Sequence, residues 1–231
     1  MDLSVIELPL ADTLIKLFAA WLLLLGVAIW AWREKLDLGK HMLLASLRGL
    51  VQLLILAFIL DYIFDIHSLA AQALLILAFC ILAARTSASH HSQPTQAWLA
   101  ASLGLAAACL VTLPWLAISG AVEADTRTLI PLGSMIAANG MNAVSLMYHR
   151  MNDTAAGIEG LRSAMIPPVD TLRVAGLVHM PGIFVGMVLA GAAPLAAATA
   201  QLIVLYMIIA SSFTACMVSF LMLNHLRKAQ A

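Results

Sequence analysis

Long apolar runs separated by short polar segments limit the fold of this chain more than any other feature of its sequence. Several runs reach the roughly 20 residues that a helix needs to cross the hydrocarbon core of a bilayer. The 231 residues are 63% hydrophobic and only 10% charged, and a soluble domain of that size cannot hide so much apolar surface. The sequence therefore predicts an all-α fold, a polytopic membrane helical bundle, with residues 1–231 as a single transmembrane domain in the lipid bilayer.

The apolar runs predict about seven transmembrane helices. Their expected bounds are Leu14–Trp32, His41–Leu60, Leu69–Ala84, Ala97–Ile118, Leu129–Tyr148, Thr171–Ala190 and Ala196–Leu223. The third is short for a full crossing. An odd number of crossings places the two termini on opposite sides of the membrane.

Basic residues gather in alternate loops and predict the orientation. One set of loops and ends carries Arg33, Lys35, Lys40, Arg85, Arg150, Arg162, Arg227 and Lys228, whereas the other set carries the single basic residue Arg127. Short cytoplasmic loops hold the excess of lysine and arginine in membrane proteins. We therefore expect the N-terminus outside and the C-terminus in the cytoplasm.

Two carboxamides, Asn139 and Asn142, lie in the fifth apolar run, three residues apart and hence on one helix face. An amide at membrane depth is costly unless it finds polar partners. Two interpretations stay open at this point: hydrogen bonds that join helices, or the lining of a polar pathway. Met135 and Met141 flank the asparagines, and their thioethers either pack in the bundle or offer soft metal ligands.

The second apolar run contains Arg48 and, one turn later, Gln52. A cation inside a membrane helix must face protein or water rather than lipid. Arg48 can alternatively extend to the nearer membrane surface, because long basic side chains reach the interface from within a helix end. The sequence leaves a structural anchor and a functional residue equally open.

The sixth apolar run is interrupted by Pro181-Gly182, with Gly186 one turn later. Proline removes a backbone hydrogen bond, so the sequence predicts a broken or kinked helix at this point. Such breaks are tolerated at membrane depth where they are buried or line a cavity, as in transporters. His179, just before the break, is either a structural residue or a group that binds a proton or a metal.

The remaining motifs mainly exclude functions. Cys80, Cys109 and Cys216 all lie in apolar runs, which predicts small buried side chains rather than a disulfide framework. No phosphate-binding GxxxxGK[ST] loop, HExxH or GxSxG motif occurs. We therefore expect a chain that is not an enzyme, binds no cofactor of its own and has no nucleic acid partner.

The stretches above, taken in order, resemble the FetB-type ABC transporter permeases, membrane subunits of a metal exporter related to plant aluminium-tolerance half-transporters. The resemblance covers most of the chain and is sharpest from Ile130 onward. The similar elements are Arg48 with Gln52, Ile130-Pro131, Met135-Ile136, Asn139 through Val144, Ile166-Pro167, Gly176-Leu177-Val178, Pro181-Gly182 and Pro194-Leu195 with Gln201.

The resemblance implies a permease of the cell inner membrane that exports iron or another metal. It also implies a homodimer of permeases and a separate ABC ATP-binding subunit, which holds ATP and magnesium. It favours the pathway interpretation, with a lining of Asn139, Asn142, Arg48, Gln52, Met135, Met141 and His179. The helix break at Pro181, Gly182 and Gly186 would then supply the bend for gating.

One departure from the family pattern concerns the ATPase. The family carries a long cytoplasmic segment with an Ala-Leu-Gly element before the second Ile-Pro, whereas this chain has only the residues from His149 to Met165. We expect a short helix over Asp153–Arg162, and the candidates for ATPase contact are Arg150, Asp153, Glu159 and Arg162. The alternatives are an ATP-independent carrier, a non-transporting membrane scaffold and, last, an intramembrane enzyme built on Ser134.

Overall fold

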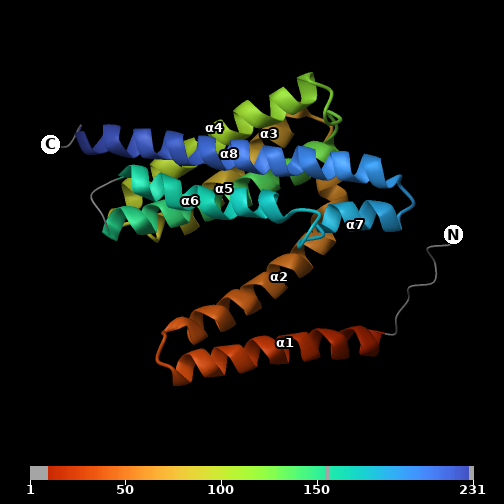
Figure 1. Ribbon diagram of the computed structural model, residues 1–231, viewed down its shortest axis with the longest axis horizontal. Coiled ribbons are helices and arrows are strands. Elements are labelled where there is room, and N and C mark those ends of the chain that lie inside the picture. The colour runs from red at the N-terminus through yellow and green to blue at the C-terminus, as the bar shows by residue number, and fades with distance from the viewer. Residues whose placement is uncertain (1–9, 154–156, 229–231) are drawn as a thin grey trace. The chain divides into compact units, whose positions relative to one another are not determined.

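The computed structural model describes residues 10–153 and 157–228, and these residues form α-helices and no β-strand, as the sequence predicts (Figure 1). The helices are α1 (Leu10–Arg33), α2 (Leu38–Phe64), α3 (Leu69–Ala88), α4 (Pro94–Ile118), α5 (Thr126–Asp153), α6 (Gly157–Val174), α7 (Gly182–Leu189) and α8 (Pro194–Lys228).

In the part of the chain that the structure describes, six helices are long and apolar enough to cross a membrane: α1, α2, α3, α4, α5 and α8. The sixth predicted crossing, Thr171–Ala190, is wrong as a continuous helix. The chain leaves α6 at Val174, turns through Gly176 with a φ of 84°, and enters α7 with Pro181 as its N-cap. The break predicted at Pro181-Gly182 is present, since α7 begins there with Pro181, which has no helical N–H to donate, as its N-cap. The left-handed turn before it is at Gly176, where glycine tolerates a positive φ.

The chain divides into two compact units, Met1–Ile63 and Phe64–Ala231. The first contains the hairpin of α1 and α2. Lys35 and Asp37 take positive φ angles of 56° and 50° in its turn, and the Trp21 indole N–H donates to Ser46 Oγ at 3.4 Å between the two helices.

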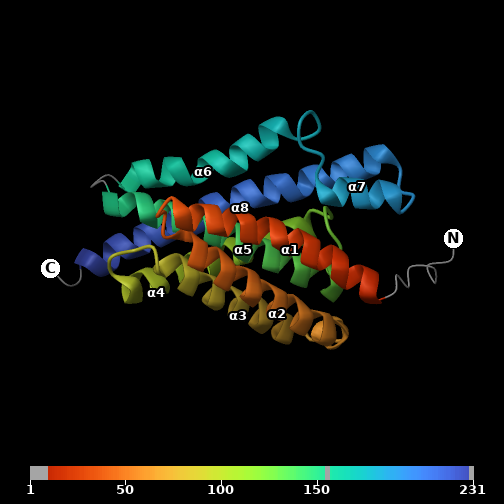
Figure 2. The same ribbon diagram turned by 90° about the horizontal axis from the view of Figure 1, so that it is seen from below.

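The second unit is a bundle of α3 to α8 in which the longest helix, α8, packs against α4, α5, α6 and α7. Figure 2 shows α6 and α7 following one another along α8. Small residues let α4 approach α8 closely: a Cβ on Gly104 would lie 2.5 Å from the carbonyl oxygen of Ala215. Close approach of this kind supplies van der Waals contact in a bilayer, where helix burial alone gives little stabilisation.

Polar groups at membrane depth in this bundle bond across helices. The Ser87 hydroxyl on α3 donates to the Met141 carbonyl on α5 at 3.0 Å, and Ser145 Oγ donates to Ser87 Oγ at 3.2 Å. At the other end of these helices, the Gln72 amide donates to Ile66 O and to Thr126 Oγ1. These bonds fix α5 against α3, and α5 carries the two asparagines.

Candidate substrate cavity

A cavity of about 170 Å³ lies between α5, α6 and α8. Its lining is Asn139, Asn142, Ala143 and Leu146 of α5, Ala164, Pro167, Pro168 and Thr171 of α6, and Leu205, Ile208 and Ser212 of α8. Both asparagines therefore face one space, as their helical spacing requires. The cavity combines an apolar wall with a few polar groups, which is the usual composition of a small-ligand site.

The asparagines do not act as hydrogen-bonded links between helices in the described structure. Asn139 Nδ2 donates to the Met135 carbonyl one turn back on its own helix, at 2.9 Å. Asn142 is exposed, and within residues 10–153 and 157–228 neither amide bonds to another helix. The amide of Asn142 and the side-chain oxygen of Asn139 are therefore available to a ligand or to water.

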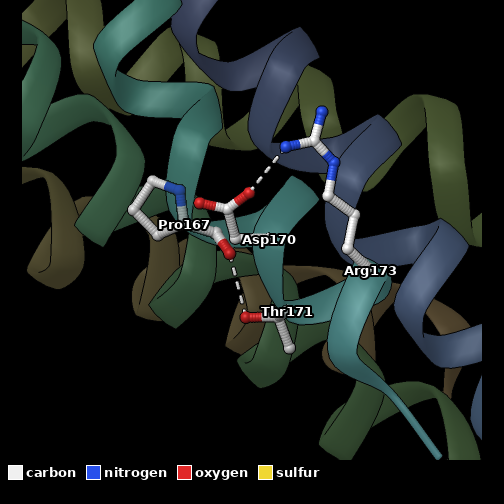
Figure 3. Close-up of polar contacts among 4 residues, drawn as sticks. All are labelled: Pro167, Asp170, Thr171 and Arg173. Carbon is white, nitrogen blue, oxygen red and sulfur yellow. Dashed lines mark hydrogen bonds and ion pairs between the residues drawn. The ribbon is translucent and has the colours of Figure 1, made fainter. Parts of the chain in front are cut away.

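The α6 wall of the cavity is rich in backbone and hydroxyl oxygen. Pro167 and Pro168 have no N–H, so the carbonyls of Ser163 and Ala164 lack their usual helical donors four residues on. The Thr171 hydroxyl lies one turn beyond Pro167 and donates to its carbonyl at 2.9 Å (Figure 3). The two prolines thus leave the carbonyls of Ser163 and Ala164 without the donors that a regular helix supplies.

The α8 wall contributes Ser212, which is only 1% exposed, beside the apolar Leu205 and Ile208. No ionisable side chain lines the cavity as described. The nearest charges in sequence, Asp170 and Arg173, form an exposed ion pair at 3.0 Å (Figure 3). The polar groups that line the cavity are neutral amides and hydroxyls. Their oxygens are the ligand type that hard cations prefer, and they can also form hydrogen bonds with the water around such a cation.

The other predicted pathway residues lie elsewhere. Arg48 and Gln52 belong to α2 in the first unit, where both are exposed. Met135 packs against the hydrophobic core, and its carbonyl accepts a hydrogen bond from Asn139. The Met141 carbonyl accepts one from the Ser87 hydroxyl. Neither thioether lines the cavity.

His179 and the break residues form the connection between α6 and α7. His179 is exposed, and its carbonyl accepts the N–H of Gly176 at 2.9 Å, which closes the turn. A Cβ on Gly182 or on Gly186 would meet nothing within 4 Å. In the described structure no helix therefore packs closely against these two glycines, and their gating role stays a prediction.

The predicted ATPase contacts gather where α5 ends and α6 begins. Arg150 is in the last turn of α5, and Glu159 pairs with Arg162 at 3.2 Å in the first turns of α6. Asp153 is the last residue of α5, but its side chain lies outside the described residues, as do residues 154–156. The expected short helix over Asp153–Arg162 is wrong in its bounds, since α6 runs on to Val174.

Sequence reasoning missed Thr171 and Ser212 as cavity residues, and it missed the middle of α6, residues 163–170. Two adjacent prolines and the charged residues Arg162, Asp170 and Arg173 give this helix a composition that is typical of a loop. The one available signal was Ile166-Pro167, which the family resemblance already singled out. The cavity itself needs the packing of α8 on α6, which local sequence does not encode.

Comparison with known proteins gives one family. The family described as "Uncharacterised protein family (UPF0014)" matches residues 14–158 and 154–226. The two matches overlap at 154–158, within the segment between His149 and Met165 that we expect from the sequence to be short for the family. The matched residues include most of α1, all of α2 to α7 and most of α8.

Individual relatives cover nearly the whole chain. The "Probable iron export permease protein FetB" of Escherichia coli (strain K12) is 29% identical over 86% of this chain and 88% of its own length. The "UPF0014 membrane protein YjkA" of Bacillus subtilis (strain 168) is 26% identical over 80% and 83%. "Protein ALUMINUM SENSITIVE 3" of Arabidopsis thaliana is 23% identical over 86% and 81%. No solved structure gives a significant match.

Proposed function

Because the chain belongs to the UPF0014 family of membrane proteins, we propose that it is the permease subunit of an ABC-type transporter that exports iron or another metal ion. The similarity to a relative named as an iron export permease supports a metal ion as the substrate. This multi-pass membrane protein carries no nucleotide-binding motif of its own. ATP and magnesium would therefore be bound by a separate ATP-binding subunit, and two permeases would complete the transporter in the inner membrane.

The single observation that carries the proposal is the cavity between α5, α6 and α8, lined by two asparagines that bond to no other helix within the described residues. An unpaired carboxamide in a membrane bundle is costly when no water or ligand reaches it. A passing cation with part of its hydration shell would supply the missing partners, since amide and hydroxyl oxygens are hard ligands. The asparagines then stabilise the substrate without binding it too tightly to leave.

Helix α6 offers a physical route from the partner to the cavity. Its first turns carry Glu159 and Arg162, both exposed, and Thr171 at the cavity lies 12 residues from Glu159, about 18 Å along the helix. Gly160 fits closely against α5, because a Cβ there would lie 2.9 Å from the Met147 carbonyl oxygen. A movement of the α6 start would thus be transmitted to Pro167, Pro168 and Thr171.

ATP binding by the partner would rock α6 against α5 and α8 and so change which side of the membrane the cavity faces. The helix has a place to bend, because Pro167 and Pro168 remove two helical hydrogen bonds. The 175–181 turn would take up the resulting displacement before α7. In this mechanism the chain performs no chemistry on ATP, and it orients and releases the metal.

The test is metal efflux from liposomes that contain the full chain with its ATP-binding subunit. We expect Asn139→Leu or Asn142→Leu to lower ATP-dependent flux at least tenfold, because leucine keeps the volume and removes the polar groups. The matched control is Asn224→Leu near the end of α8, outside the cavity lining, which should keep normal flux. Full flux in both cavity variants, with folding intact, would refute the proposal.

The short segment between His149 and Met165 favours one second candidate, an ATP-independent carrier. The same liposomes separate the two functions: a carrier moves metal without the partner or ATP, whereas a coupled permease does not. Charge reversal at Arg162→Glu should reduce only the ATP-dependent flux. A protein that moves no metal in either condition, yet folds and binds a membrane partner, would instead be a scaffold.

A further inference from the structure

Two cysteine thiols outside the asparagine cavity face each other across a helix interface. Cys80 on α3 is fully buried and Cys109 on α4 is 6% exposed, and their Sγ atoms lie 3.6 Å apart. They are 29 residues apart in the chain, so the packing of α3 on α4 brings them together. Both are free thiols, and neither lines the cavity assigned above.

The thiol pair opens onto a second, larger cavity. Its volume is about 820 Å³, and it is lined by α3, α4 and the start of α5 with the loop before it, including both cysteines. The lining is almost wholly apolar, and one polar group in it, Gln72 Oε1, has no hydrogen-bond partner. The Cys109 thiol also lies 4.0 Å from the Gly133 carbonyl oxygen of α5.

The ligand set decides which ions this pair could hold. Structural zinc requires four ligands of the cysteine, histidine or carboxylate type, and no group of three such side chains exists in the described residues. Calcium and magnesium require six or more oxygens. Sulfur donors are soft and select monovalent d¹⁰ ions such as Cu(I), which accept as few as two ligands.

We propose that Cys80 and Cys109 form a two-coordinate binding site for a soft monovalent cation of the Cu(I) and Ag(I) class. One thiol loses its proton and the other keeps it: two R–SH groups and M⁺ give M(SR)(HSR) and one H⁺. The bound unit carries no net charge, which suits an apolar cavity because an unpaired buried charge is costly. No electron transfer is involved.

The geometry requires only a small adjustment. Metal–sulfur bonds of about 2.3 Å place the two sulfurs of a linear complex about 4.6 Å apart. The sulfurs are 3.6 Å apart without an ion, so they must separate by about 1 Å. Rotation of the two short side chains toward the adjoining cavity supplies that distance without moving α3 from α4.

The experiment uses the purified full chain in detergent with Ag⁺, a redox-stable probe of this ion class, in the presence of excess glutathione. Cys216→Ser is the matched control, because Cys216 is an equally buried thiol on α8 with no neighbouring thiol. We expect wild type and Cys216→Ser to retain one Ag⁺ per chain by mass spectrometry. Cys80→Ser and Cys109→Ser should each bind at least 100-fold more weakly, since a chelating pair gains about 10²–10⁴ from effective concentration.

A wild-type chain that keeps no Ag⁺ against glutathione would overturn the proposal, and so would unchanged binding in both single variants. Because a serine variant could also lose its fold, a second measurement uses wild type alone. In the folded chain, after glutathione is removed, Ag⁺ should slow the alkylation of Cys80 and Cys109, but not that of Cys216, by a small apolar reagent. Protection of Cys216 instead would equally refute the site, and none of these results depends on transport.

Discussion

The contact between α4 and α8 gives a quantitative prediction for Gly104→Ala. The new Cβ would clash with Ser219 Oγ and lie 2.5 Å from the Ala215 carbonyl oxygen. This distance is about 0.9 Å shorter than the shortest ordinary van der Waals contact. Because the carbonyl belongs to the backbone and cannot rotate away, the two helices must separate. Overpacking of this kind costs about 1–3 kcal/mol, which corresponds to a Tm lower by about 2–12 °C for a chain of this length.

The assay is thermal unfolding in one detergent, and the control is Gly186→Ala in α7, where a Cβ meets nothing within 4 Å. Alanine there should leave Tm unchanged or raise it slightly, because it is the better helix former. Adding Ser219→Ala to Gly104→Ala should restore only part of the loss, since the carbonyl contact remains. An unchanged Tm in Gly104→Ala would refute the close packing of α4 on α8.

Two further predictions concern the ends of the bundle. Burial and the neighbouring Arg227 guanidinium, 2.8 Å from Nε2, lower the pKa of His91 below its ordinary 6.5. His91 therefore binds a proton more readily in the unfolded chain than in the folded chain. Its contribution to the free energy of unfolding is complete above pH 6.5 and is lost as the pH falls below that value. His91→Gln should flatten the fall in Tm between pH 7 and 5, and an equal fall would contradict this. Gly160→Ala should push α6 off the Met147 carbonyl and halve ATP-dependent flux or more, with a smaller loss of Tm than Gly104→Ala because its Cβ contact is longer (2.9 Å against 2.5 Å), whereas unchanged flux would contradict the α6 route.

The transmembrane helices were predictable because each is set by its own composition. The expected Leu69–Ala84 and Ala97–Ile118 correspond to α3 and α4, with ends that differ by a few residues. An apolar run of about 20 residues must satisfy its backbone as a helix in lipid, whatever its neighbours. The break before Gly182 was predictable for the same reason, since proline acts locally.

Helix α6 was not predictable in this way. Its polar and proline-containing sequence has the composition of a loop, and it is stabilised by packing on α5 and α8. The thiol pair, 29 residues apart in the chain, and the full cavity lining likewise depend on contacts between different helices. The shared face of the two asparagines was predictable from spacing, because two residues three apart on one helix share a face in any fold. Their assignment to a pathway came from the family resemblance and stays a prediction.

The two cavities differ in the hardness of their donors, and this difference separates their roles. Asn139, Asn142 and Thr171 present oxygen and amide groups, which exchange hard, hydrated cations readily. Cys80 and Cys109 present sulfur, which holds soft ions with far less exchange. A transport path must release its cargo, so weak oxygen ligands suit it and a thiol pair does not. If the proposed transport function holds, a soft ion bound between α3 and α4 would therefore remain on the protein while the transported metal passes α5, α6 and α8.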